Sequence, residues 1–231
     1  MVFLRENQLT ISLVLLIICA VNSILIYFRK SLPVRRRIIV SILQLTVVFL
    51  LLADHYAYIF RGNETNLGWW MVRISNFGIF FFSISIIFMF NLYLKQIIKI
   101  DSTTEKPPRK LFVCDIFLGI SLLLLIISLF TNMYYSFDET NHYHRAQGQI
   151  ICYLFLVSVL FLQLVCILQN FKTITLKLRI LLIIFTLVPI IAAVLQIFMY
   201  GLSIINISFG IPAIFLFVCE FFGKNAASST V

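Results

Sequence analysis

The sequence predicts an all-α membrane protein, a bundle of seven transmembrane helices with its N-terminus outside the cell and its C-terminus in the cytoplasm. Of its 231 residues 61% are hydrophobic and only 12% are charged. The mean hydropathy of +1.05 lies far above what soluble domains sustain. The apolar residues also form seven separate runs, each close to the length of about 20 residues that crosses a bilayer as a helix.

These seven runs define the expected helices in order along the chain. Each run is mostly apolar, and basic or polar residues separate it from the next. The helices are expected at residues 9–28, 38–60, 70–94, 111–133, 149–171, 180–200 and 204–222. The first run is too long for a cleavable signal peptide and is expected to stay in the mature protein. Residues 1–222 thus form one membrane domain, and residues 223–231 are expected to be a disordered cytoplasmic tail.

Local signals mark several features of these helices. Asn66 is placed to cap the third helix, and the segment Ser136-Phe-Asp-Glu139 matches a capping box that opens a short helical extension before the fifth. Pro189 and Pro212 lie inside the sixth and seventh helices. Each proline ring removes a backbone hydrogen bond and permits a kink, so motion could be concentrated in these two late helices.

The distribution of basic residues predicts the orientation. The connections after the first, third and fifth helices, together with the tail, hold all but four of the 18 Lys and Arg residues. The four exceptions are Arg5, Arg61, Arg73 and Arg145. The positive-inside rule therefore makes the basic face cytoplasmic, and the Tyr and Trp residues at the opposite boundary match an interfacial belt. Topology explains the net charge of +9, so no nucleic-acid partner is expected.

Polar residues inside the helices are few, and each needs a partner or a purpose, because a charge at the bilayer centre costs about 2.5–3.5 kcal/mol. Asp54 in the second helix and Arg73 in the third are expected at matching depth and are therefore predicted to pair; Asn76 shares the face of Arg73. Gln196 and Asn206 add polar groups in the outer halves of the last two helices. A structural salt bridge with interhelical amide bonds and a ligand pocket both remain open.

Two acidic residues near the cytoplasmic helix ends are expected to have an ordinary role. Asp115 and Glu220 are expected to snorkel or to pair with Lys110 or Lys224. No chemistry is assigned to either of them.

The longest external segment, residues 134–145, has the densest mixture of polar groups. Asp138, Asn141, Tyr143 and Arg145 combine carboxyl, amide, phenol and guanidinium groups. Such a mixture suits recognition of a small polar or zwitterionic ligand. The alternative is a capped helix start with interfacial tyrosines, which needs no ligand.

The three histidines, His55, His142 and His144, all fall at the predicted outer face, where a zinc site is conceivable. Two residues that are two apart on a helix point about 200° apart, so His142 and His144 could coordinate together only in an extended segment. We therefore expect no metal and no cofactor.

Several classes of seven-helix protein are excluded because the sequence lacks the residues that characterise them. A retinal protein needs a Schiff-base lysine in its last helix, and residues 204–222 contain none. The outer disulfide and the helix motifs typical of G-protein-coupled receptors are absent from the sequence. A small-solute transporter of seven-helix type stays open, although the helix prolines occur only in the last two helices and not at matched positions of two halves.

Several short segments together resemble a known group of membrane sensors. These segments are Leu51-Leu-Ala-Asp54, Arg73-Ile-Ser-Asn76-Phe, residues 135–145, Pro189, Gln196 and Tyr200-Gly-Leu-Ser203. They resemble the seven-helix N-terminal input domains of membrane-bound bacterial diguanylate cyclases and sensor histidine kinases, particularly those of Firmicutes. The resemblance implies a helical bundle that reads an external or membrane signal and passes it through the last helix to a cytoplasmic output domain.

The expected function is therefore a non-enzymatic sensory or receptor-like domain in the cell membrane, and the alternative is a small-solute transporter. The expected partners are the lipid bilayer, a small polar ligand at the outer face, and a cytoplasmic output domain or partner, with a homodimer left open. Because this chain stops soon after Phe222, we expect a truncated or a free-standing sensor. The predicted ligand-binding residues are Asp54, Arg73, Asn76, Asp138, Asn141, Tyr143, Arg145, Gln196 and Asn206.

Overall fold

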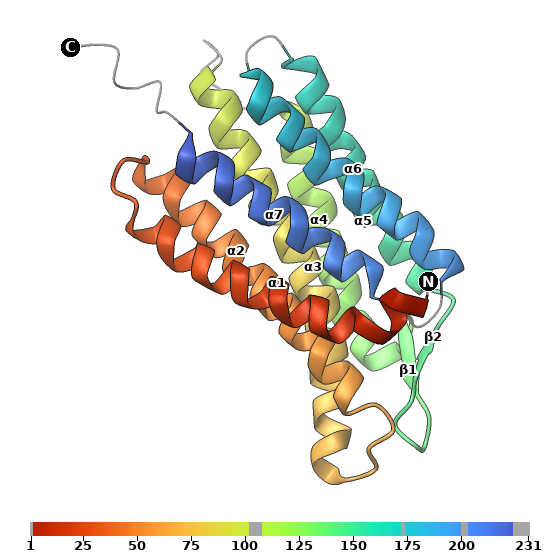
Figure 1. Ribbon diagram of the computed structural model, residues 1–231. Helices are drawn as coiled ribbons and strands as arrows, with labels where there is room; N and C mark the ends of the chain where they lie inside the picture. The colour runs from red at the N-terminus through yellow and green to blue at the C-terminus, as the bar shows by residue number, and fades with distance from the viewer. Residues whose placement is uncertain (1, 102–107, 172–173, 200–202, 224–231) are drawn as a thin grey trace, which may run out of the picture.

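The computed structural model describes residues 2–101, 108–171, 174–199 and 203–223 (Figure 1). Seven helices and one β-hairpin make up this part of the chain. In chain order they are α1 (Val2–Phe28), α2 (Val34–Ile59), α3 (Asn66–Asp101), α4 (Arg109–Thr131), β1 (Tyr135–Phe137), β2 (Tyr143–Arg145), α5 (Gln149–Gln169), α6 (Leu176–Phe198) and α7 (Ile204–Phe222). Each helix is long and apolar enough to cross a membrane, which confirms the predicted multi-pass, seven-helix architecture.

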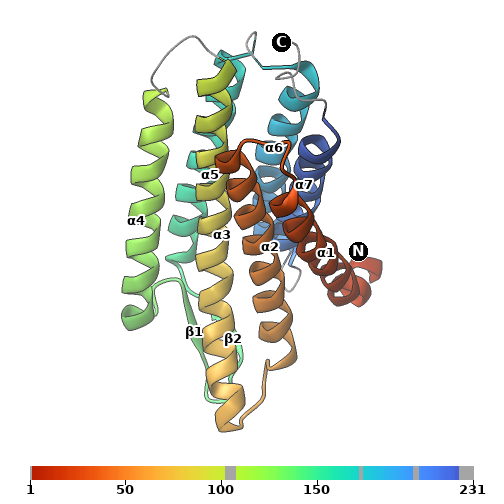
Figure 2. The ribbon, with the colours of Figure 1, turned by 90° about the vertical axis from the view of Figure 1, so that its left-hand side faces the viewer.

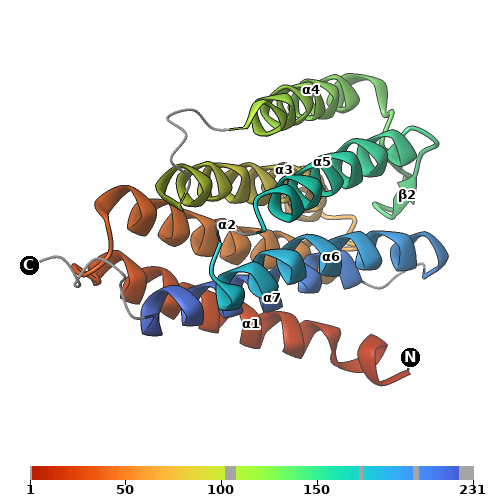
Figure 3. The ribbon, with the colours of Figure 1, turned by 90° about the horizontal axis from the view of Figure 1, so that it is seen from above.

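The helices form a ring in which each packs on its neighbours in sequence, and α7 closes the ring by packing on both α1 and α2. Helix α3 lies near the centre, because it also contacts α5 and α7. Helix α4 lies at the edge of the bundle and packs mainly on α3 and α5, as the view from above shows (Figure 3). The bundle therefore brings α2, α3, α5 and α7 around a common interior.

The two ends of the bundle differ in structure and in charge. One end, here called the hairpin end, carries the β-hairpin, the α2–α3 connection and the start of α7 (Figure 2). The opposite end, here called the basic end, carries the α1–α2 connection, the starts of α4 and α6 and the end of α7. Arg35, Arg36, Arg37, Arg109 and Lys110 all lie at the basic end.

Apolar side chains fill the interior, and small residues allow α2 and α3 to approach closely. The Phe90 and Phe185 rings stack with their centroids 4.0 Å apart. A Cβ atom added to Gly78 on α3 would lie 3.2 Å from the Ala53 Cβ on α2. Close backbone approach of this kind is typical of membrane helices, where packing, and not exclusion of water, holds helices together.

The start of α3 differs by one residue from the predicted cap. The helix begins at Asn66, and the Thr65 hydroxyl accepts a hydrogen bond of 3.1 Å from the Gly68 backbone N–H. Thr65 is thus the residue whose side chain caps the helix, because a capping oxygen reaches the third residue after it. The prediction that Asn66 is the cap is wrong.

The predicted helical extension before α5 is also wrong, because the segment forms a β-hairpin. Strand β1 pairs antiparallel with β2, and Phe137 lies opposite Tyr143. The Asp138 carboxylate accepts hydrogen bonds from the backbone N–H groups of Thr140 and His142, which closes the turn instead of starting a helix. Asn141 completes the turn with a left-handed φ of 59°.

Ion pairs at the basic end link helices that are distant in sequence. Arg36 on α2 donates to Glu220 on α7 at 2.5 Å, and the Tyr93 hydroxyl on α3 donates to the same carboxylate. Lys95 and Asn91 on α3 both bind Asp115 on α4. Lys110, expected as a partner, instead donates to Gln169, and donors from neighbouring helices surround the two carboxylates. Lys224 lies outside the described residues.

Candidate functional site

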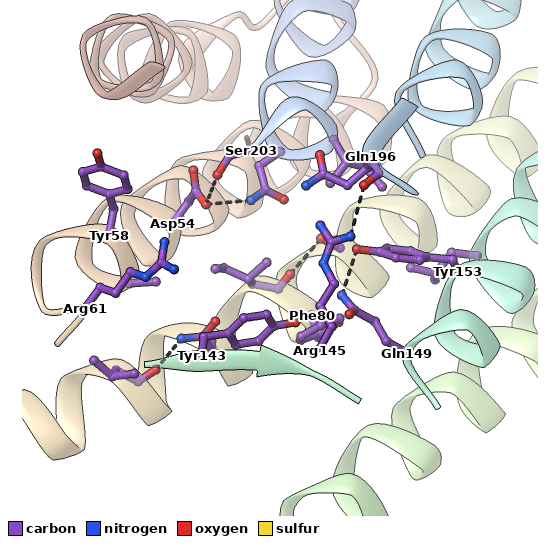
Figure 4. Close-up of a pocket in the computed structure, with 18 residues that line it drawn as sticks. Asp54, Tyr58, Arg61, Phe80, Tyr143, Arg145, Gln149, Tyr153, Gln196 and Ser203 are labelled. Carbon is purple, nitrogen blue, oxygen red and sulfur yellow. Dashed lines mark hydrogen bonds between the residues drawn. The ribbon is translucent and has the colours of Figure 1, made fainter. Parts of the chain in front are cut away.

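A cavity of about 170 Å³ lies at the hairpin end of the bundle (Figure 4). Its walls come from α2, α3, strand β2, α5, the end of α6 and the start of α7. The polar residues that line it are Asp54, Tyr58, Arg61, Asn76, Ser83, Tyr143, Arg145, Gln149, Tyr153, Gln196, Ser203 and Asn206. Such a concentration of polar groups inside an apolar bundle identifies the candidate functional site.

Asp54 links α2 to the start of α7 within this cavity. Its carboxylate oxygen Oδ1 accepts a hydrogen bond of 2.8 Å from the Ser203 hydroxyl and one of 2.9 Å from the Asn206 amide. The residue is only 9% exposed. Two neutral donors thus hold a buried carboxyl group, and its second oxygen, Oδ2, accepts no hydrogen bond from the described residues.

Arg73 lies outside the cavity lining and has a different set of partners. Its guanidinium carbon lies 3.9 Å from the centroid of the Trp69 ring and 4.8 Å from that of Phe137. It also donates a hydrogen bond of 3.0 Å to the Asn141 side-chain oxygen. Aromatic faces and an amide oxygen therefore stabilise this cation, and the predicted Asp54–Arg73 ion pair is wrong.

The hairpin tip forms a second polar cluster, which also lies apart from the cavity. His144 Nε2 lies 2.9 Å from Asp138 Oδ2. The hydrogen bond with His144, followed by that from the His142 backbone N–H, holds the pKa of the Asp138 carboxyl well below its usual range. Asn141 fixes the tip to the α2–α3 connection, since its amide donates to the Asn63 carbonyl at 2.9 Å.

Hydrogen bonds also join the end of α6 to the hairpin and to α7. Arg145 donates to the Gln196 backbone carbonyl at 3.1 Å, near the last turn of α6. The Gln196 side-chain oxygen accepts a hydrogen bond of 3.1 Å from the Ile204 backbone N–H at the start of α7. On the opposite wall, Gln149 donates to the Tyr153 hydroxyl at 3.0 Å. Hydrogen bonds thus cross-link the walls that β2, α6 and α7 provide, whereas the Gln149–Tyr153 bond lies within α5.

The nine residues predicted to bind a ligand fall into two groups. The cavity brings six of them together, and the other three, Arg73, Asp138 and Asn141, belong to the hairpin tip and its contacts. The six are Asp54, Asn76, Tyr143, Arg145, Gln196 and Asn206. The tip residues can therefore act on a ligand only through the position of the hairpin.

The histidines considered for zinc do not converge. His142 and His144 are close to Asp138, with nitrogen-to-oxygen distances of 3.8 and 2.9 Å, whereas His55 lies on α2 against the Tyr56 ring. Within the described ranges no group of three His, Cys, Asp or Glu side chains is arranged to hold a metal ion. The His144 ring is hydrogen-bonded with Asp138, and the His142 ring is hydrogen-bonded with the Thr140 hydroxyl at 2.9 Å.

The sequence prediction missed Tyr58, Arg61, Gln149, Tyr153 and Ser203, which all line the cavity. A helical-spacing signal was present for one of these. Tyr58 follows Asp54 by four residues on α2, the spacing of one helix face, whereas Arg61 lies beyond the end of α2. The positions of Gln149 and Ser203 at the ends of α5 and α7 gave no such signal.

Comparisons of the chain with protein-family models, with curated proteins and with solved structures find no match. The resemblance to bacterial sensor domains therefore stays an expectation. The geometry and chemistry of the site are therefore the basis for a functional proposal.

Proposed function

We propose that this protein is a membrane sensory domain that binds a small polar ligand in the hairpin-end cavity and passes the signal on through α7. One observation carries the proposal. Asp54, a buried carboxyl group in the cavity wall, accepts hydrogen bonds from the side chains of Ser203 and Asn206 at the start of α7. A ligand that binds Asp54 would act on those two hydrogen bonds. Ligand binding and the position of α7 are then coupled at a single residue.

The output would leave from the opposite end of the same helix. Near the basic end Glu220 on α7 binds Arg36 on α2 and Tyr93 on α3. A shift of α7 in response to a ligand would have to preserve or break these contacts. Because packed interfaces tend to switch between discrete arrangements, such a contact could convert a small shift at the cavity into a defined change at the basic end.

In this proposal the hairpin end faces the outside of the cell and the basic end faces the cytoplasm. The concentration of Lys and Arg near the basic end supports this orientation by the positive-inside rule. The cavity would then sample external solutes. A cytoplasmic output domain or partner would receive the signal at the end of α7.

A ligand-binding experiment on the purified full chain tests the proposal. Thermal unfolding in detergent, measured across a panel of small polar metabolites, should identify ligands that raise the unfolding temperature. Asp54→Asn and Arg145→Gln should each weaken that binding about tenfold, the effect of losing one hydrogen bond to a charged group. Asp115→Asn is the matched control, because Asp115 binds Lys95 on the far side of the bundle.

Transport is the alternative, and the same protein in proteoliposomes distinguishes it. A sensor should bind its ligand without moving it across the bilayer. Accumulation of the ligand, driven by its own gradient or by an ion gradient, would contradict the sensor and favour a small-solute transporter. Absence of any binding across the panel would contradict both.

A further inference from the structure

Three carboxylate or amide oxygens on α2, α3 and α7 line the cavity and accept no hydrogen bond from the described residues; Gln149 Oε1, on the α5 wall, is a fourth. Asp54 uses only Oδ1, so Oδ2 stays without a donor. Asn206 donates its amide nitrogen to Asp54, and its oxygen is buried without a partner. Asn76 donates to the Val72 carbonyl at 2.8 Å, which leaves its own oxygen without one. The Asn206 oxygen is fully buried, and a buried acceptor needs a donor. All three oxygens come from helices that line the same cavity.

Charged donors also line the cavity. Arg61 follows Asp54 by seven residues and lines the cavity, and Figure 4 shows its side chain directed into the same space as Asp54. Its guanidinium group makes no ion pair or hydrogen bond with the residues that the structure describes. Arg145 lines the cavity from β2 and holds the end of α6. Guanidinium groups bind carboxylates through paired N–H donors.

The lining therefore offers both oxygens without donors and charged N–H donors. An anion alone would satisfy the guanidinium groups but would leave the Asp54, Asn76 and Asn206 oxygens without donors. A cation alone would have to lie beside two arginines. A protonated primary amine offers three N–H donors and no acceptor, which matches the three oxygens.

We infer that the cavity takes a small zwitterion, with a primary ammonium group toward Asp54, Asn76 and Asn206 and an anionic group toward Arg61. This inference rests on the function proposed above and names the class of its ligand. The volume of about 170 Å³ lies below the range of about 300–1,000 Å³ that drug-sized ligands occupy. A free amino acid or the phosphoethanolamine headgroup of a lipid has the required chemistry.

Matched ligands test the class directly. Thermal unfolding of the full chain in detergent should be measured with amino acids, with the same molecules lacking the amine, with the same molecules lacking the carboxylate, and with O-phosphoethanolamine. The amino acids or O-phosphoethanolamine should raise the unfolding temperature more than either single-charge analogue. Whichever of the two zwitterions binds identifies the source as a free metabolite or a lipid headgroup.

Two variants assign the two ends of the ligand. Asp54→Asn should weaken binding of the zwitterion at least about tenfold and leave the amine-free acid unaffected. Arg61→Gln should weaken the zwitterion and the acid but not the carboxylate-free amine. Because Arg61 is exposed, its variant should fold normally even if Asp54→Asn does not. Arg35→Gln, an exposed arginine at the other end of α2, is the control.

The outcomes separate the ligand class from the proposed function. If the acid or the amine alone binds as tightly as the zwitterion, or if Arg61→Gln has no effect, the zwitterion inference is wrong while the sensor proposal stands. If no compound of any class binds the wild-type protein, both are wrong.

Discussion

At Asp54 a buried carboxyl group is held by two neutral donors instead of a cation. Hydrogen bonds from Ser203 and Asn206 converge on a single oxygen. Neutral donors stabilise a carboxylate less than an arginine would, and they leave its charge available to a ligand. The partners of Asp54 come from the start of α7 and not from α3. This explains both why its second oxygen has no donor and why it forms no ion pair with Arg73.

A double-mutant cycle distinguishes the two sets of partners. Asp54→Asn combined with Asn206→Leu should show a coupling energy of about 0.5–3 kcal/mol, since the two side chains share a hydrogen bond. Asp54→Asn combined with Arg73→Gln should be additive within about 0.3–0.5 kcal/mol. Unfolding free energies of the detergent-solubilised protein provide the measurement. Coupling of Asp54 with Arg73, and none with Asn206, would contradict the assignment made here.

At the scale of single elements, the β-hairpin is fixed by its own turn and by side chains outside it. Tyr135 stacks on Phe80 of α3 with ring centroids 5.4 Å apart, and Arg73 holds Asn141 at the tip. Within the turn Asp138 binds both the backbone of His142 and the ring of His144. The hairpin thereby holds Tyr143 and Arg145 in the cavity wall.

Loss of the Asp138 carboxylate should loosen this hairpin. Asp138→Asn should increase hydrogen exchange of the amides in residues 135–145, whereas Glu139→Gln, the neighbouring exposed acid in the same turn, should not. Because the folded pKa of Asp138 is depressed, its stabilising effect is present above the unfolded value of about 3.9. The difference between wild type and Asp138→Asn should therefore shrink as the pH falls below about 3.9. A difference that persisted or grew in acid would exclude the carboxylate as its cause.

The sequence alone predicts the seven helices but not the β-hairpin. Hydropathy over about 20 residues is a local property, and it located all seven helices. Helix α3 ends at Asp101 instead of residue 94, because its last turns are too polar for a hydropathy criterion while remaining helical. The sequence of the Ser136–Glu139 segment is compatible with a capping box as well as with a strand. Only the pairing of Tyr135–Phe137 with Tyr143–Arg145 shows that the segment forms a β-hairpin.

The sequence predicts many of the polar residues of the candidate site but not which of them contact one another. Polar residues in apolar helices are conspicuous, so Asp54, Asn76 and Asn206 could be selected from the sequence alone. Depth in the membrane could not show which helix lies beside α2 at Asp54, because α2 packs on α1, α3 and α7. Arg61 was counted only as an external charge, and its place in the cavity depends on how α2 and the hairpin meet.

For the whole molecule, α7 connects the two ends of the bundle. It packs on α1, α2 and α6, binds Asp54 near the hairpin end and binds Arg36 near the basic end. Helix α4, at the edge of the ring, has no comparable contacts with the cavity lining. A signal that passes through the bundle should therefore depend on α7 and be insensitive to changes on the exposed face of α4.

The direction of that signal depends on the orientation in the membrane, which accessible cysteines can determine. Glu139→Cys at the hairpin tip and Ser31→Cys in the α1–α2 connection both change exposed positions. Four of the five native cysteines are buried and the fifth is partly buried, so background labelling should be low. A membrane-impermeant maleimide added to intact cells should label Glu139→Cys and should label Ser31→Cys only after permeabilisation, because the basic end is expected in the cytoplasm. The reverse pattern would place the cavity on the cytoplasmic side, and the protein would then sense an internal solute.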